Sequence, residues 1–240
     1  MLHPTNNSAD VRNLVLAALP AEAYERLARS LEPVKLETGK VFHEIGEPIE
    51  DAYFINHGII SKVIVLEDGA TVEIGVVGRE GAIGISALLG AEHSLQRNMV
   101  QIAGDAWRIK IAALKAEFNR GGQLQAMLLR FMRSMMAQAA QAAVCNGLHK
   151  VEERLARWLL MTSRRLESDK LPLTQEFISH MLGTRRSGVS VAAGMLQKAG
   201  LIDYTRGHIT ILNTEGLEQA TCECYWVVKA ELDNYLQSLK

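Results

Sequence analysis

The most restrictive feature of this sequence is a change of pattern near residue 104. Between Pro33 and Gly104 the chain consists of short apolar and β-branched runs separated by glycines, whereas residues 123–145 contain neither glycine nor proline. Short runs punctuated by glycine favour strands joined by turns, and an uninterrupted apolar stretch favours one long helix. The chain therefore divides into a β-rich N-terminal part and a helical remainder.

Three runs in the first part have strand character: residues 53–55, 59–66 and 71–77. Glu67-Asp68-Gly69 separates the last two and is typical of a hairpin turn. Residues 11–30 precede these runs and predict two short helices divided by Pro20. The N-terminal part is therefore expected to be a roll or barrel of short strands.

Length and composition limit the class of protein. A chain of 240 residues, 48% hydrophobic and 22% charged, predicts two domains of a soluble protein. No apolar run reaches the roughly 18 residues of a membrane helix, and residues 1–10 do not resemble a signal peptide. Three cysteines suit a reducing compartment. We expect a cytoplasmic protein that does not contact a membrane.

The long stretch without glycine predicts a helix with an apolar seam. Positions 124, 128, 131, 135, 138, 142 and 145 follow the four-three spacing of a coiled coil. The helix is expected to form a homodimer, through a predicted interface of Leu124, Leu128, Phe131, Met135 and Ala142. The alternative is a helix buried within one chain.

A break at Asn146-Gly147 is expected to end this helix, and residues 149–166 predict a second amphipathic helix. This places the domain boundary. The expected domains are residues 1–120 (β-roll), 121–147 (dimerisation helix) and 148–240 (C-terminal domain).

A helix-turn-helix pattern follows. Thr174 can cap a short helix that ends at Gly183, and a second helix begins at Thr184 or Arg185 and ends before Gly200. Small residues in the second helix allow the two helices to cross closely. An ordinary pair of packed helices would give the same pattern.

Two β-type runs, residues 201–204 and 208–211, come directly after the second helix. A hairpin in this position predicts a winged helix-turn-helix, whose second helix enters the major groove of DNA. Residues 154–206 also hold nine basic against four acidic residues, as expected where phosphates are neutralised.

Arg186 is the first candidate for reading a base, since it lies in the first turn of the second helix and a guanidinium can donate two hydrogen bonds to guanine. Each of the other candidates has the alternative of being a solvated surface residue. The predicted DNA-binding residues are Thr174, Thr184, Arg185, Arg186, Ser187, Ser190, Arg206 and His208.

The order of these parts, together with Gly46-Glu47-Pro48, the segment from Val77 to Gly84, Leu88-Leu89-Gly90 and residues 174–202, resembles the Crp/Fnr (catabolite activator protein) superfamily of bacterial regulators. The resemblance covers nearly the whole chain. It implies an α+β fold: a double-stranded β-helix domain of the cyclic-nucleotide-binding kind, a dimerisation helix and a winged helix-turn-helix. It also implies a homodimer on a palindromic operator in double-stranded DNA, with RNA polymerase as a partner.

The chain departs from this family in the effector pocket. Cyclic-nucleotide-binding members place a glutamate against the ribose and an Arg-Ser/Thr-Ala stretch on the phosphate, whereas this chain has Ala82 and Arg97-Asn98-Met99 at the matching places. The predicted, degenerate pocket residues are Gly81, Ala82, Gly84, Arg97, Asn98 and Met99. We expect a different effector or none, and the alternative is a cyclic nucleotide in an altered pocket. Ser187 and Val191 also depart from the family's recognition helix, so the operator does not follow by analogy.

Other chemistries find little support in the sequence. No cysteine precedes Cys145, which excludes the N-terminal iron-sulfur cluster of some family members. Cys145 and His149 are four apart and Cys222 and Cys224 two apart, but neither pair alone makes a closed metal site. Haem stays open. A cupin-like enzyme would need a His-x-His ligand set, which the sequence lacks, so we expect no enzyme, cofactor or metal site.

Overall fold

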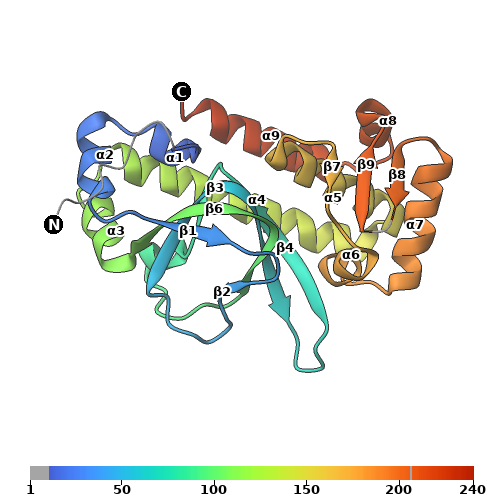
Figure 1. Cartoon of the computed structure of the whole chain (residues 1–240), viewed down its shortest axis with the longest axis horizontal. Coiled ribbons are helices and arrows are strands. Elements are labelled where there is room, and N and C mark those ends of the chain that lie inside the picture. Colours follow the sequence, from blue (N-terminus) through green and yellow to red (C-terminus); the bar gives the residue numbers. More distant parts are fainter. Residues whose placement is uncertain (1–10, 206) are drawn as a thin grey trace. The chain divides into compact units, whose positions relative to one another are not determined.

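The computed structural model describes residues 11–205 and 207–240, and Figure 1 shows the order of their elements. The contacts divide the chain into two compact units. The first contains residues up to 60 together with 77–132 and 236–240, and the second contains 61–76 and 133–235. The tip of one hairpin therefore belongs to a different unit from its base.

Two short helices come first, followed by a roll of antiparallel strands that belongs to the first unit except for residues 61–76. Asn13 caps the first helix and donates to the carbonyls of Ile55 and Gly81, each at 2.8 Å, which ties the helix to the roll. The sheet order is β1-β6-β3-β4, with β2 on β6 and β5 on β3. The elements are α1 (Leu14–Ala17), α2 (Ala21–Ala28), β1 (Glu32–Leu36), β2 (Val41–His43), β3 (Asp51–Val65), β4 (Thr71–Val77), β5 (Ala82–Ile83), η2 (Ile85–Leu89), β6 (Arg97–Lys110) and α3 (Ile111–Phe118).

Strand β3 joins two runs that the sequence separates. Gly58 lies between them with φ +89°, and a Cβ there would be 2.5 Å from the carbonyl oxygen of Ile102. Glycine is therefore required for the close approach of the two backbones, and the strand continues through it. The predicted turn before β4 is confirmed, with Gly69 at φ +83° and Leu66 N donating to Ala70 O at 2.8 Å.

The long helix α4 (Gln123–Leu148) extends past the predicted break at Asn146-Gly147. That prediction was wrong because one glycine costs a helix only about 1 kcal/mol, which packing can offset. The break falls at Lys150, whose extended backbone caps α5 (Val151–Leu166) while Glu153 accepts from the Lys150 amide at 3.0 Å.

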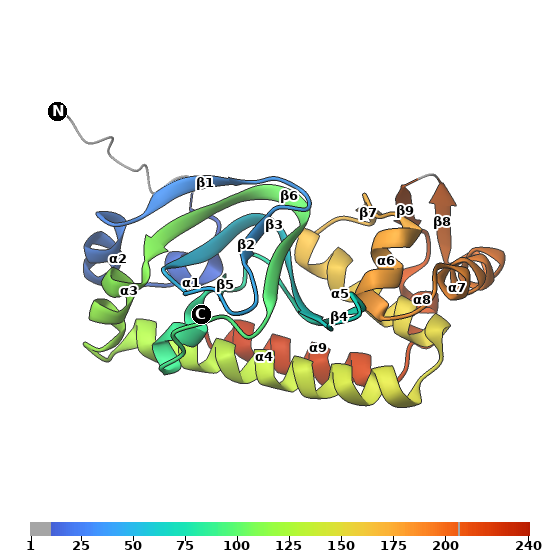
Figure 2. The same cartoon turned by 90° about the horizontal axis from the view of Figure 1, so that it is seen from below.

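The second unit holds the helices and strands that follow α5, seen from another side in Figure 2. Its three-stranded sheet has the order β7-β9-β8. No element was predicted after residue 212, where two helices follow. The elements are β7 (Lys170–Leu171), α6 (Gln175–Leu182), α7 (Arg186–Lys198), β8 (Ile202–Thr205), β9 (His208–Ile211), α8 (Thr214–Gln219) and α9 (Cys224–Gln237).

Helix α9 contacts the second half of α4. Arg133 of α4 pairs with Glu231 of α9 at 2.7 Å, and Figure 2 shows the two helices side by side. Among residues 11–205 and 207–240, no helix combines the length and hydrophobicity required to span a bilayer.

Candidate nucleic-acid interface

Helices α6 and α7 form the predicted helix-turn-helix. Thr174 Oγ1 accepts from Phe177 N at 3.2 Å and caps α6, and Gly183 ends the helix in the left-handed region at φ +57°. Arg185 is extended, so α7 begins at Arg186. The turn between the helices is residues 183–185, as short as the sequence predicts, because a left-handed residue ends a helix and redirects the chain within one residue.

Helix α7 presents one face to the core and one to solvent. Val189, Ala192, Ala193 and Leu196 are buried. The opposite face carries Val191, which is 65% exposed. An exposed apolar side chain on such a face can contact a thymine methyl group in the major groove.

The predicted DNA-binding residues lie around this face and the wing. Ser190 Oγ donates to Gln175 Oε1 at 2.7 Å, which links the first turns of α6 and α7. Thr184 is half-buried in the turn. Arg206 lies outside the described residues. The exposed candidates are Thr174, Arg185, Arg186, Ser187, Ser190 and His208.

The wing is the hairpin of β8 and β9. Ile202 pairs with Ile211 and Thr205 with His208, so alternate residues face the core. Gly207 at φ +76° lies in the turn, where a Cβ would be 3.9 Å from the Thr174 methyl group. The wing turn therefore lies beside the N-terminus of α6, the end of a helix that favours phosphate.

The excess of basic residues in this segment is only partly available to DNA. Arg154, Arg157 and Arg165 of α5 are buried, and Arg164 is paired with Asp233. Arg154 donates to the carbonyl oxygen of Leu182, the last residue of α6. This role was not predicted from the sequence: a buried guanidinium on α5 donates to the carbonyl end of the first helix of the motif.

The tip of the β3–β4 hairpin contacts the same end of α6. Thr71 Oγ1 donates to the His180 carbonyl at 3.2 Å, and a Cβ on Gly183 would be 3.3 Å from a Val72 methyl group. Trp158 Nε1 of α5 donates to Glu73 Oε1 at 2.8 Å. Burial raises the pKa of Glu73 to about 7, although Ser61, Trp158 and two arginines oppose the shift.

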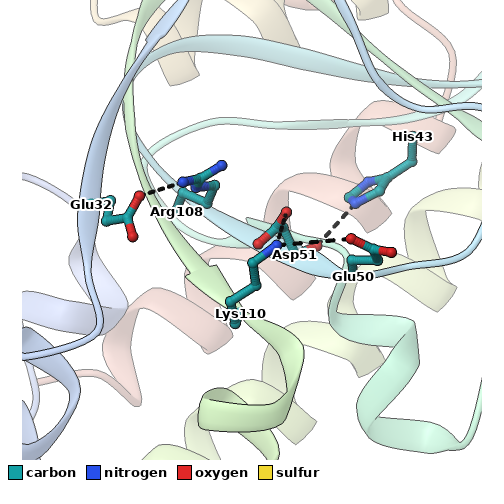
Figure 3. A network of polar contacts seen from close by, with 6 residues as sticks. All are labelled: Glu32, His43, Glu50, Asp51, Arg108 and Lys110. Carbon is teal, nitrogen blue, oxygen red and sulfur yellow. Dashed lines mark hydrogen bonds and ion pairs between the residues drawn. The ribbon is translucent and has the colours of Figure 1, made fainter.

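Two side chains of the predicted effector pocket, Arg97 and Asn98, form hydrogen bonds with other residues of the same chain. Arg97 pairs with Glu44 at 2.8 Å and also donates through Nε to both of its carboxylate oxygens. The buried Asn98 side chain forms a hydrogen bond with His43 Nδ1 at 3.2 Å. Figure 3 shows the other contact of this histidine, in which His43 Nε2 lies 3.0 Å from the Asp51 carbonyl oxygen. The arginine expected on a cyclic phosphate therefore has a carboxylate partner of its own.

The remaining predicted pocket residues lie in the strands and turns of the roll. Ala82 is buried and pairs with Phe54, and Met99 is half-buried opposite Val41. Gly84 has φ +81°. A Cβ on Gly81 would lie 2.0 Å from Phe131 Cζ, so the Phe131 ring fills that space.

An open pocket lies elsewhere on the roll. It has a volume of about 360 Å³ and is lined by Val34, Lys35, Glu37, Lys40, Val41, Phe42, Tyr53 and Arg108. Arg108 is paired with Glu32, and Lys110 nearby with Asp51 at 3.2 Å (Figure 3). None of the predicted pocket residues lines it.

The seam predicted on α4 faces the interior of the chain. Leu124, Leu128, Phe131 and Ala142 are buried without a second copy, and Met135 is half-buried. Gln138, on the same seam, accepts from Val76 N at 2.9 Å. A different set of apolar residues on α4 is exposed: Leu129, Met136, Val144 and Leu148.

One group of residues in the second unit could hold a metal. Cys145, His149, Cys222 and Cys224 each offer a ligand atom, and these atoms lie within 4.8 Å of one another. In the sequence these residues form two separate pairs, and neither pair alone predicted a metal site. The fold brings them together because α9 begins beside the end of α4.

Comparison with known proteins agrees with the architecture. Residues 153–220 match the Crp-like helix-turn-helix domain. The transcriptional regulatory protein btr of Bordetella pertussis is 22% identical over 213 residues, which cover 85% of this chain and 88% of that protein. The fumarate and nitrate reduction regulatory protein of Escherichia coli K12 is 22% identical over 196 residues, 77% of this chain and 76% of the relative.

Two solved structures extend the comparison. FixK2 from Bradyrhizobium japonicum has a TM-score of 0.70 at 18% identity and covers 80% of this chain and 98% of its own. TTHA1359, a Crp/Fnr-family transcriptional regulator from Thermus thermophilus, has a TM-score of 0.64 at 21% identity and covers 79% and 97%. The resemblance to the Crp/Fnr superfamily and the predicted fold class are confirmed.

Proposed function

We propose that this chain, which resembles Crp/Fnr regulators along most of its length, is a DNA-binding transcriptional regulator that acts as a homodimer in the cytoplasm. The observation that carries the proposal is the exposed first turn of α7, where Arg186 and Ser187 follow a tight turn, together with a wing turn that lies beside Thr174. A helix presented in this way can place its first residues against base edges while the wing holds the backbone.

The DNA site follows from this arrangement. Arg186 donates to guanine, Val191 contacts a thymine methyl group, and Ser187 and Ser190 bond bases or phosphates. A twofold dimer presents two such helices about 34 Å apart, so the operator is a palindrome with half-sites one helical turn apart. RNA polymerase is the partner we propose at the promoter.

In vitro selection of bound duplexes with the full-length protein tests the proposal. We expect an enriched palindrome whose half-site centres are about 10 base pairs apart. Selection without enrichment, or an enriched site that has no twofold symmetry, would overturn it.

The homodimer uses the exposed face of α4 and not the seam first predicted. Leu129, Met136 and Ala143 repeat every seven residues on that face, and Arg133 and Ala140 lie at the alternate positions. This is the heptad spacing of a two-helix seam, and its small residues allow two copies of the helix to approach closely.

Sedimentation of the variant that combines Leu129→Glu and Met136→Glu tests this interface. We expect monomers with unchanged helix content, because both side chains are exposed in the single chain. Leu95→Glu, at a residue that is 79% exposed on the roll, is the matched control and should remain dimeric. Dimers of the double variant would contradict the assignment.

The effector, if there is one, is not cyclic AMP. The Arg97–Glu44 pair supports this, because a phosphate would have to displace a bidentate carboxylate, and Ala82 offers nothing to a ribose hydroxyl. Calorimetric titration with cyclic AMP and cyclic GMP should give no heat of binding. Micromolar binding that Arg97→Ala abolishes would favour the alternative of an altered cyclic-nucleotide pocket.

A further inference from the structure

We propose that Cys145, His149, Cys222 and Cys224 form a binding site for Zn²⁺. Cys145 and His149 lie at the end of α4, one helical turn apart. Cys222 and Cys224 lie between α8 and the first turn of α9. All three cysteine side chains are buried, and the His149 side chain is only 16% exposed.

The spacing of the ligand atoms fits one tetrahedral ion. Cys145 Sγ lies 3.5 Å from Cys222 Sγ, and Cys224 Sγ lies 3.4 Å from His149 Nδ1. Zinc bonds of about 2.3 Å to sulfur and about 2.0 Å to nitrogen place tetrahedral ligands about 3.8 Å and 3.5 Å apart. The cluster therefore needs only small side-chain adjustments to close on an ion.

The donor set selects the kind of metal. Three thiolates and one imidazole are a common structural zinc set, whereas Ca²⁺ and Mg²⁺ prefer oxygen ligands. An iron-sulfur cluster holds its cysteines around several atoms and spaces their sulfurs more widely than these ligand atoms, which all lie within 4.8 Å. A single borderline-soft cation is the occupant that fits.

The surroundings of the ligands support the same assignment. His149 Nδ1 faces Cys224, and its other ring nitrogen, Nε2, lies 3.4 Å from the Glu223 carboxylate. A histidine that binds a metal through one nitrogen commonly donates the other N–H to a carboxylate, which fixes the ring. Three thiolates around Zn²⁺ leave one negative charge, and Arg154 interacts electrostatically with Cys145 and Cys222.

The position of the site gives it a structural consequence. Two ligands precede residues 153–220, the Crp-like helix-turn-helix domain, and two follow it. An ion would therefore join the two ends of that domain to the end of α4. Because metal binding adds directly to folding free energy, we expect the ion to stabilise the second unit. The site needs no DNA and stands independently of the proposed function.

Metal content and cobalt spectroscopy of the full-length protein test the site. Protein purified from zinc-supplemented cells under reducing conditions should retain one zinc per chain. After removal of zinc, Co²⁺ should give the intense visible and near-ultraviolet bands of tetrahedral thiolate coordination. Cys222→Ser should abolish both signals, and Glu223→Gln should weaken zinc affinity about 10- to 100-fold while keeping the stoichiometry.

His93→Gln is the matched control, since His93 is an exposed histidine of the roll, and it should keep full metal content. Because Cys222→Ser could prevent folding, the test of metal binding relies on the cobalt spectrum of the unmodified protein, which requires no variant. Absence of zinc together with absence of thiolate-to-cobalt bands overturns the proposal. So does a mass two units below that of the reduced chain in protein purified without reductant, because this would mean a disulfide between two of the three cysteines.

Discussion

Helices α5 and α7 use the same side chain in opposite ways. On α5 the guanidinium groups of Arg154, Arg157 and Arg165 are buried within the fold, whereas Arg185 and Arg186 at the start of α7 are exposed. The difference lies in their position relative to the apolar stripe. The α5 arginines are themselves among the buried residues of their helix, while the α7 pair precedes the first buried residue, Val189. A count of positive charge along the sequence therefore overstates the surface that DNA meets.

The buried polar groups around α5 should respond to pH. The pKa of Glu73 rises from 4.5 to about 7 in the folded state, so the stability it confers is complete below pH 4.5 and is lost as the pH rises through 7. Glu73→Gln removes the charge and keeps an acceptor for Trp158. We expect the variant to be more stable than the original at pH 8, by about 3 kcal/mol at most, and equally stable at pH 4.5.

Urea unfolding at both pH values measures this difference. Glu67→Gln, in the exposed turn of the same hairpin, should change stability little at either pH. An equal gain for Glu73→Gln at pH 4.5 and pH 8 would show that folding does not shift the pKa of this carboxyl, because only a shifted pKa makes the difference in stability depend on pH.

A second substitution tests whether the arginines of α5 and α7 differ in their contribution to stability. Arg154→Met keeps an unbranched side chain on α5 and leaves the Leu182 carbonyl without its buried donor. We expect a loss of about 2 kcal/mol in the free energy of unfolding, whereas Arg185→Met should change stability little. Thermal unfolding of the two variants compares them. Similar melting temperatures would mean that the α5 arginine is dispensable to the fold.

The exposed arginine should matter for DNA and not for stability. Arg186→Ala removes a base contact worth about 1 to 3 kcal/mol and relaxes preference at one base pair per half-site. Titration of matched and scrambled duplexes at several salt concentrations measures it. An equal loss on both duplexes would assign Arg186 to the phosphate backbone.

The smallest expected effect is at Val191. Val191→Ala removes two methyl groups from the exposed face of α7 and should cost about 1 kcal/mol of binding to duplexes with thymine opposite that position. Replacing that thymine with uracil, which lacks the methyl group, should cancel the difference. A difference that persists with uracil would contradict a methyl contact.

Local patterns predicted most of the fold. The Glu67-Asp68-Gly69 turn, the Thr174 cap and the Gly183 stop each depend on neighbouring residues only, and each is found where the sequence places it. The break at Asn146-Gly147 failed because tertiary packing outweighs a single glycine. The helices after the wing carry weaker patterns and were not predicted.

The two faces of α4 show why the seam could not be chosen from spacing. Residues 124–145 satisfy the four-three pattern along one side, and Leu129, Met136 and Ala143 satisfy it along another. A helix covered on one side by its own chain and available on the other is apolar on both. Only burial distinguishes the face that contains Phe131 from the face that contains Met136.

The cysteine and histidine cluster was hidden for a different reason. Its two halves, C-x3-H and C-x-C, are separated by the entire helix-turn-helix, and each half alone is too common to identify a site. The two halves come together because α9 runs alongside α4, and helix α9 was not predicted from the sequence.

The hairpin of residues 61–76 also limits how this protein can be divided. Thr71, Val72 and Glu73 come from the strands of the roll, yet their partners are His180, Gly183 and Trp158. A fragment that begins at residue 148 would leave the Trp158 indole and the end of α6 uncovered. The helix-turn-helix therefore cannot be transferred to another protein by itself. A chimera that joins it to another roll would need these three hairpin residues as well.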